Sequence, residues 1–168
     1  MSTTTPVISV HSLELQPRPE VWLPPPTART RFDAKLARVA EKMGLSKLGC
    51  TMTQVAPGCT AYPFHSHRAN DELFYIIGGR GELRLGESRH AVTAGDVVGC
   101  PAGGPKTAHQ LINTGEAPLT YLAISTQTDP EICEYPDSGK VGAYDGSGDS
   151  ELAHLSHYKS TLDYWDGE

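Results

Sequence analysis

The amino-acid sequence predicts an all-β protein built as a sandwich or a barrel. From Lys47 to Gln127, short apolar or alternating runs follow one another, and glycine, proline or asparagine separates most of them. The 168 residues include 17 glycines and 13 prolines, which suits a chain with many tight turns. Short strands at such regular spacing are typical of sandwich and barrel folds.

Each expected strand is an apolar or alternating run that stops at a turn signal. In chain order we expect strands over residues 48–55, 72–77, 81–86, 91–94, 97–98, 110–113 and 119–124. The run 72–77 is almost entirely apolar, so we expect both of its faces to be buried. The run 81–86 alternates apolar with charged residues, which is the pattern of a half-buried strand.

The segment ahead of the strands is expected to contain one short covering helix. Residues 31–43 place apolar side chains three or four positions apart, which predicts a helix. Those side chains are Phe32, Leu36, Val39 and Met43. Gly44 is expected to end the helix, because glycine is common just after a last helical turn.

Proline dominates residues 1–30, which prevents a long helix there. We expect this segment to run extended over the surface or across a partner subunit. The chain is therefore divided into an N-terminal arm and covering helix over residues 1–45, a barrel core over 46–128 and a C-terminal extension over 129–168 that packs on the barrel.

Composition argues against several classes of function. The net charge is -6 and no cluster of lysines and arginines occurs, so we expect no nucleic-acid partner. No apolar run approaches the roughly 20 residues needed to cross a bilayer, so we expect no membrane contact. The N-terminus lacks a basic region followed by an apolar core, which argues against a secretory signal.

The cysteines support a cytoplasmic location. None of the four belongs to a CxxC pair, so we expect small buried thiols in a reduced cytoplasmic protein. They are Cys50, Cys59, Cys100 and Cys133.

Three histidines and a glutamate in the middle of the chain predict a metal site. His65 and His67 are two residues apart, so on a strand both imidazoles project from the same face. Glu72 opens the apolar run that follows, and His109 directly precedes a later strand. Three imidazoles and one carboxylate inside a sheet are suitable ligands for a transition metal.

The residues around these four positions resemble the two sequence motifs of the cupin family. Residues 57–79, PGCTAYPFHSHRANDELFYIIGG, match the first motif, glycine, His-x-His, glutamate and glycine. Residues 95–113, GDVVGCPAGGPKTAHQLIN, match the second. The matching positions are Gly58, His65, His67, Glu72, Gly79, Gly95, Pro101, Gly103, His109 and Asn113. The resemblance implies a double-stranded β-helix, which is a jelly-roll barrel with the metal inside.

In cupins the His-x-His pair, the glutamate and the later histidine bind the metal, which implies those roles for His65, His67, Glu72 and His109. Asp71, beside Glu72, is the alternative carboxylate; we prefer Glu72 because it directly precedes the apolar run. Three residues more than in the family motif separate Gly103 from His109, so His109 is the ligand most open to displacement. The ion is a divalent transition metal, and these ligand types admit Zn, Mn, Fe, Ni or Cu.

Four further residues are candidates for proton donation or substrate binding beside the metal. Tyr62 and Tyr75 are more typical of packing but lie near enough in sequence to donate a proton. Arg68 and Lys106 have the character of solvated loop charges, and their closeness to the ligands makes them weak candidates for holding an anionic substrate. The catalytic acid or base is not identified by the sequence.

The activity stays open among three hypotheses. The first is a metal-dependent isomerase acting on a small polar metabolite such as a sugar or sugar phosphate. It draws on the YPDSGK segment and the Asp-Tyr-Trp ending, which are similar to those of small bacterial cupins described loosely as sugar-phosphate-isomerase-like. The second is an iron-dependent oxygenase, and the third is a non-catalytic small-molecule binder. The resemblance also implies a homodimer.

Overall fold

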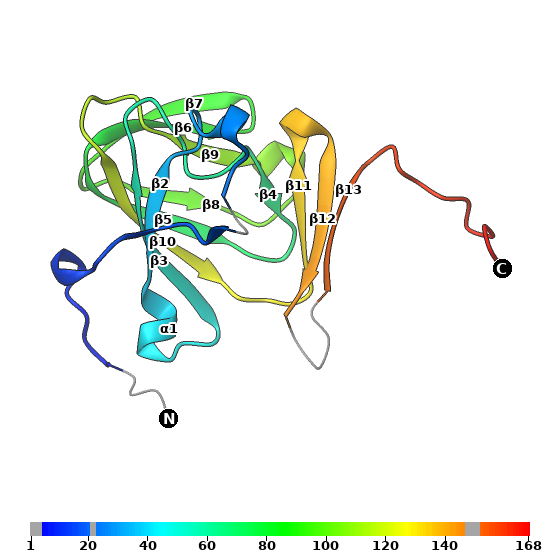
Figure 1. Ribbon diagram of the computed structural model, residues 1–168, viewed down its shortest axis with the longest axis horizontal. Helices are drawn as coiled ribbons and strands as arrows, with labels where there is room; N and C mark the ends of the chain where they lie inside the picture. Colours follow the sequence, from blue (N-terminus) through cyan, green and yellow to red (C-terminus); the bar gives the residue numbers. More distant parts are fainter. Residues whose placement is uncertain (1–4, 21–22, 147–151) are drawn as a thin grey trace.

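The computed structural model describes residues 5–20, 23–146 and 152–168, and over these residues it is an all-β fold with one short α-helix (Figure 1). The strands form three antiparallel sheets that curve around a common interior. The predicted fold class, a jelly-roll barrel with an N-terminal arm and one short helix, is confirmed.

The largest sheet has six strands in the order β1-β2-β3-β10-β5-β8, and every neighbouring pair is antiparallel. Its strands are β1 (Gln16–Pro17), β2 (Ala34–Arg38), β3 (Leu48–Val55), β5 (Glu72–Gly78), β8 (Val97–Cys100) and β10 (Leu119–Thr126). The long central strands were predicted within one or two residues of their ends. Strand β2 was not predicted.

A three-stranded sheet faces it, with β6 (Arg80–Leu85) between β7 (Ser88–Thr93) and β9 (His109–Ile112). The main core fills the space between these two sheets. Val55, Ile76 and Leu119 come from the larger sheet, and Leu83 and Leu111 come from the smaller one. All five side chains are buried.

A four-stranded sheet stands at one side of the barrel, where the hairpin of β11 and β12 is seen in yellow and orange (Figure 1). Its strands are β4 (Ser66–His67), β11 (Glu131–Tyr135), β12 (Lys140–Asp145) and β13 (Leu152–His157). Strand β11 pairs with β4, so Cys133 lies opposite His67 and Glu134 opposite Ser66. None of the last three strands was predicted. They bring the C-terminal part of the chain directly beside the predicted metal ligands.

The remaining elements are short. The 3-10 helices among the described residues are η1 (Val10–Ser12), η3 (Pro26–Ala28), η4 (Pro105–Thr107) and η5 (Pro136–Ser138). Leu162, Tyr164 and Trp165 near the C-terminus are largely exposed, and Figure 1 shows this end of the chain extending away from the barrel. No helix in the described part of the chain is long and apolar enough to cross a membrane.

The helix expected over residues 31–43 is wrong in its first half. Helix α1 covers only Val39–Met43, whereas Ala34–Arg38 forms strand β2 and pairs with β3. The three- and four-residue spacing is outweighed by the hydrogen bonds and packing that this segment gains at the edge of the sheet. Gly44 ends the helix with φ 72°, as expected.

The expectation that both faces of residues 72–77 are buried is also wrong. Phe74 and Ile76 face the core, but Leu73 and Tyr75 on the other face are 39% and 43% exposed. The outer face of the large sheet is covered elsewhere, where Ile8 and Leu13 of the N-terminal arm pack against Met52 and its neighbours. The N-terminal arm therefore runs over the surface of the barrel, as expected, because its apolar side chains pack against this face of the sheet.

Asn113, the last residue of the second motif segment, binds three backbone groups through its buried side chain. Its Nδ2 donates to the carbonyls of Val55 and Ala117, both at 2.9 Å, and its Oδ1 accepts from Gly115 N at 2.9 Å. We expect Asn113→Ala to lower the free energy of unfolding by about 2–4 kcal/mol, because it leaves buried backbone groups without partners. Urea denaturation measures this, with the exposed neighbour variant Thr114→Ala as the control. A loss as small as that of Thr114→Ala would contradict the prediction.

Candidate metal centre

Backbone pairing brings the predicted histidines together. His65 and His109 form an isolated antiparallel bridge, in which His65 N donates to His109 O at 3.2 Å and His109 N donates to His65 O at 2.7 Å. His67 lies two residues further on, in β4, which is held by β11. Residues 44 positions apart in the sequence, His65 and His109, are therefore adjacent in space.

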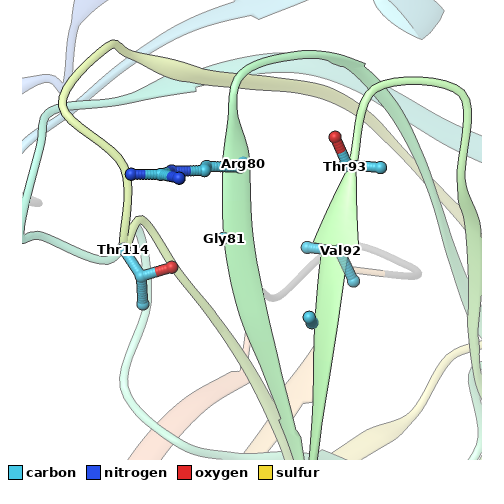
Figure 2. A pocket seen from close by; sticks show the side chains of 6 residues that line it. Arg80, Gly81, Val92, Thr93 and Thr114 are labelled. Carbon is cyan, nitrogen blue, oxygen red and sulfur yellow. The ribbon is translucent and has the colours of Figure 1, made fainter.

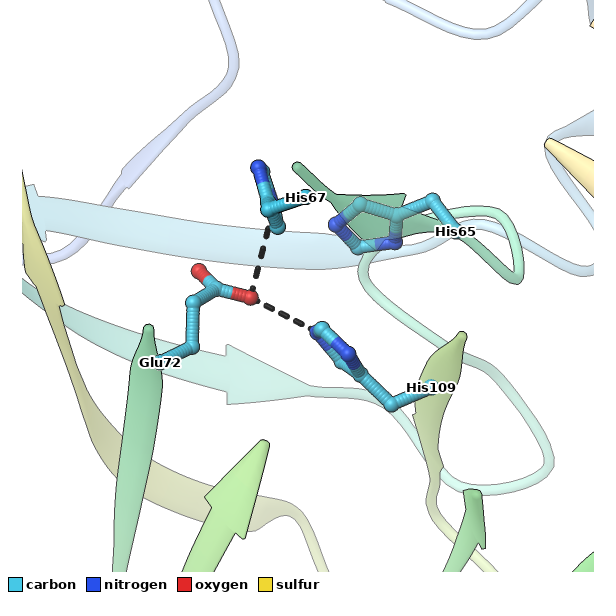
Figure 3. A group of neighbouring side chains, drawn as sticks. All are labelled: His65, His67, Glu72 and His109. Atoms are coloured by element: carbon cyan, nitrogen blue, oxygen red, sulfur yellow. Dashed lines mark hydrogen bonds and ion pairs between the residues drawn. The ribbon is translucent and has the colours of Figure 1, made fainter. Parts of the chain in front are cut away.

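Glu72 completes the group from the large sheet. It is the first residue of β5, and His109 is the first residue of β9. One ligand atom from each of His65, His67, Glu72 and His109 lies within 4.8 Å of all the others. Figure 3 shows the four side chains pointing toward one another, with His65 and His67 from the segment at β4, Glu72 from β5 and His109 from β9. Glu72 Oε2 lies 2.7 Å from His109 Nε2 and 3.5 Å from His67 Nε2.

Each imidazole has its Nδ1 atom turned toward an oxygen outside the group. His65 Nδ1 lies 2.8 Å from Pro63 O, His109 Nδ1 lies 3.4 Å from Thr107 O, and His67 Nδ1 lies 3.4 Å from Glu131 Oε2. An N–H at Nδ1 would donate to these acceptors and leave the Nε2 lone pair free for an ion. The histidines are thus oriented as metal ligands usually are.

Within this group of four residues, one buried atom also lacks a hydrogen bond. His67 Nε2 is inaccessible to solvent and has no hydrogen-bond partner among the described residues. A buried polar atom without a partner is costly unless another interaction compensates. A divalent transition metal would provide that interaction, and three imidazoles with one carboxylate are a donor set that such ions accept. The residues present therefore fit the implied ion, although they do not select among metals.

The protonation of the group follows from burial and close contacts. Burial, with the neighbouring imidazoles His109 and His67, lowers the pKa of His65 to about 4. Burial also lowers the pKa of His67, but its contacts with Cys133 and Glu72 outweigh this effect and raise the pKa to about 10. Burial raises the pKa of Glu72, yet its hydrogen bond with His109 and its ion pair with His67 hold that pKa well below the usual range.

Glu131 is one of the site residues that the sequence reasoning missed. Its side chain is buried, and its Oε1 accepts hydrogen bonds from the backbone N–H groups of Arg68, Ala69 and Ile132 at 2.8, 3.1 and 2.8 Å. Its Oε2 accepts from Asn70 Nδ2 at 2.5 Å and lies near His67 Nδ1. Because it sits 64 positions beyond His67, in a region expected to be irregular, no local spacing pointed to it.

Two more residues of β11 surround the histidines. Cys133 Sγ lies 3.4 Å from His67 Nδ1, and the thiol is buried and free. The ring of Tyr135 stacks over His65 with centroids 6.1 Å apart. His67, Glu131 and Cys133 also form a second group whose ligand atoms lie within 4.8 Å of one another. Since it shares His67, it is part of the same site.

The alternative carboxylate and the two tyrosines lie apart from the group. Asp71 is exposed and accepts a hydrogen bond from Ala102 N at 2.7 Å. Tyr75 occupies the opposite face of β5 from Glu72, so its hydroxyl points away from the site. Tyr62 lies at the margin of the group, with its ring centroid 6.2 Å from that of His65, and the guanidinium of Arg18 lies over the Tyr62 ring at 4.3 Å from its centroid.

The two candidate substrate-binding cations are not brought to the metal ligands. Arg68 is engaged by Glu134, with Nε–Oε2 at 2.8 Å and Nη2–Oε1 at 2.9 Å. Lys106 is exposed in η4. Helix η4 itself takes up the three additional residues between Gly103 and His109, so the longer loop leaves His109 in contact with Glu72.

Two depressions differ in their relation to the group. The larger, of about 350 Å³, is lined by Arg80, Val92, Thr93 and Thr114 among others, at the end of β6 remote from the Leu85–His109 pairing (Figure 2). The smaller, of about 200 Å³, is lined by His67, Glu72, Glu131 and residues of the segment 125–129. A molecule held near the metal would occupy the smaller one.

The fold and the site together define a jelly-roll barrel with an internal His/Glu cluster. Residues 51–125 match the Cupin_2 family model, described as a cupin domain. A sugar phosphate isomerase from a cupin superfamily of Silicibacter pomeroyi superposes with a TM-score of 0.77 at 25% identity, over 96% of this chain and 98% of that one. Residues 51–125 thus match the cupin domain, and the chain shares its fold with proteins of the cupin superfamily.

Two other relatives extend the comparison. A predicted oxalate decarboxylase of Thermotoga maritima has a TM-score of 0.58 at 21% identity, over 73% of this chain and 99% of that one, which bears on the fold alone. An uncharacterized protein of Methanocaldococcus jannaschii is 36% identical over 74 residues, 42% of this chain. The match spans 57% of that relative's length.

Metal binding should release a proton from His67. Its pKa of about 10 means that His67 is protonated near pH 8 in protein stripped of metal, whereas a ligand must be neutral. His65, with a pKa of about 4, is already neutral at that pH and releases none. We expect His67 to contribute about one proton per Zn²⁺ bound, measured by calorimetry in buffers of different ionisation enthalpy. Binding heats independent of the buffer would contradict this.

Glu131→Gln should weaken metal binding without removing a ligand. A glutamine Nε2 facing His67 would donate to Nδ1, which moves the ring proton to Nε2 and blocks the ligand atom. We expect metal affinity to fall about 10- to 100-fold, measured by competition with a chelating dye. Glu134→Gln is the matched control, because Glu134 lies on the same strand and contacts Arg68 rather than His67. Equal affinities in the two variants would show that Glu131 does not orient His67.

Proposed function

We propose that this chain is a metal-dependent cupin enzyme that binds one divalent transition metal and isomerises a small polar metabolite such as a sugar or sugar phosphate. His65, His67, Glu72 and His109 are the proposed ligands. The observation that carries the proposal is the mutual closeness of their ligand atoms, within 4.8 Å, with each Nδ1 turned outward. The Silicibacter pomeroyi protein, named as a sugar phosphate isomerase, supports the reaction class.

When bound, such an ion polarises a carbonyl as a Lewis acid and eases removal of a proton from the adjacent carbon. The chain must then supply a group that moves the proton. Glu72 is a poor base because it is a proposed ligand, and Glu131 is engaged by three backbone N–H groups. Asp129 is an exposed carboxylate lining the same depression, and we assign the proton transfer to it.

Metal content tests the ligand set directly. We expect about one equivalent of metal in the wild-type protein after supplementation, and loss of that metal in both His65→Ala and His109→Ala. Asp71→Ala is the control, because Asp71 is adjacent to Glu72 in sequence but bonded to Ala102. Mass spectrometry of the elements measures the content, and circular dichroism verifies that the variants fold. Metal retained by His109→Ala would remove His109 from the set.

The reaction class is tested on the metal-loaded protein, first without oxygen and then with oxygen and Fe²⁺. Isomerisation between an aldose and a ketose in D₂O is expected to place deuterium on the carbon beside the carbonyl, which NMR detects. Activity that requires Fe²⁺ and consumes oxygen would instead identify an oxygenase. Ligand binding without turnover under either condition would identify a non-catalytic binder.

A further inference from the structure

We propose that the depression beside the metal centre receives an uncharged polyhydroxylated molecule rather than its phosphate ester. The inference rests on the proposed metal site and narrows the substrate class assigned to it. It is drawn from the charge and chemistry of the walls of the smaller depression, which is called the acidic pocket below.

The acidic pocket adjoins the proposed metal and is small. His67 and Glu72 form part of its lining, so a molecule inside it would lie next to two of the ligands. Its volume of about 200 Å³ corresponds to roughly seven water molecules in the liquid, and lies below the usual range of sites for drug-sized ligands. A single small metabolite is therefore the expected occupant.

Carboxylates dominate the charge of this pocket. Glu72, Asp129 and Glu131 line it, and no lysine or arginine occurs in its lining among the described residues. A divalent ion would bring two positive charges against these three negative ones, with His67 neutral as a ligand. The pocket would keep a net negative charge, which disfavours a phosphate dianion.

The cations nearest in sequence do not change this balance. The guanidinium of Arg68 pairs with Glu134, and Tyr158 donates a further hydrogen bond to the same carboxylate at 2.7 Å. Lys106 lies exposed in η4 and is not part of the lining. Neither side chain is placed to neutralise a phosphate held in the acidic pocket.

Neutral polar groups complete the walls. Thr128 contributes a hydroxyl to the lining. The hydroxyls of Thr126 and Tyr144 and the amide of Gln127 also line the pocket, and each already has a hydrogen-bond partner in the chain. Together with carboxylates that accept hydrogen bonds, such groups match the alternating donors and acceptors of a polyol. This combination favours hydroxyl-rich molecules over apolar ones and over anions.

Matched pairs of ligands test the inference on the metal-loaded full-length chain. D-ribose and D-ribose 5-phosphate, and D-glucose and D-glucose 6-phosphate, are titrated while ligand-observed NMR reports binding. We expect each neutral sugar to bind at least about tenfold more tightly than its phosphate. Tighter binding of the phosphates, or no binding of any sugar, would overturn the inference.

A pair of variants ties the preference to the pocket. Asp129→Asn removes one wall charge and is expected to narrow the difference between sugar and phosphate, whereas Glu116→Gln, an exposed carboxylate outside the pocket, should leave it unchanged. An unchanged difference in Asp129→Asn would overturn the charge argument. Metal content is measured on the same samples. Absence of metal contradicts the proposed function, whereas bound metal with a preference for phosphate contradicts only this inference.

Discussion

The bridge between His65 and His109 is the constraint on which the site depends. Two main-chain hydrogen bonds join His65, just before β4, to His109 at the start of β9. The two imidazoles are therefore held side by side. Glu72 then meets His109 from the large sheet, and Phe74 packs against the His109 ring with centroids 5.7 Å apart. The apolar core thus packs directly against the His/Glu cluster, whose buried polar atoms would be costly without partners.

Strand β11 is the second element on which the His/Glu cluster depends, because it connects the cluster to the C-terminal part of the chain. Glu131 is held by three backbone donors and Asn70, so its carboxylate cannot turn away from His67. Pairing of β11 with β4 also places Cys133 and Tyr135 over the histidines. The C-terminal strands therefore enclose the site as well as pack on the barrel, and the orientation of His67 depends on residues far from the metal motifs.

The sequence predicted the parts of the fold whose signals are local. Glycine-bounded runs located β3, β5, β6, β9 and β10, and the His-x-His spacing with Glu72 located the cluster. Residues 34–38 were misassigned because a helical spacing there is outweighed by pairing with β3, a contact that no local pattern encodes. Glu131 escaped for the same reason, since its role exists only after β11 pairs with β4. The exposed face of β5 shows that an apolar run does not reveal what covers it.

Charge near the metal, more than the shape of the barrel, decides which molecules reach it. This chain shares its fold with the Silicibacter pomeroyi and Thermotoga maritima proteins at 25% and 21% identity, and a common architecture does not fix the substrate. In this chain the C-terminal strands and the segment before them bring further acidic side chains close to Glu72. Asp129 and Glu131 add negative charge where a phosphate-binding site needs positive charge, and Arg68 is held by Glu134. A chain that placed a free arginine there would present the same metal ligands to a different class of molecule.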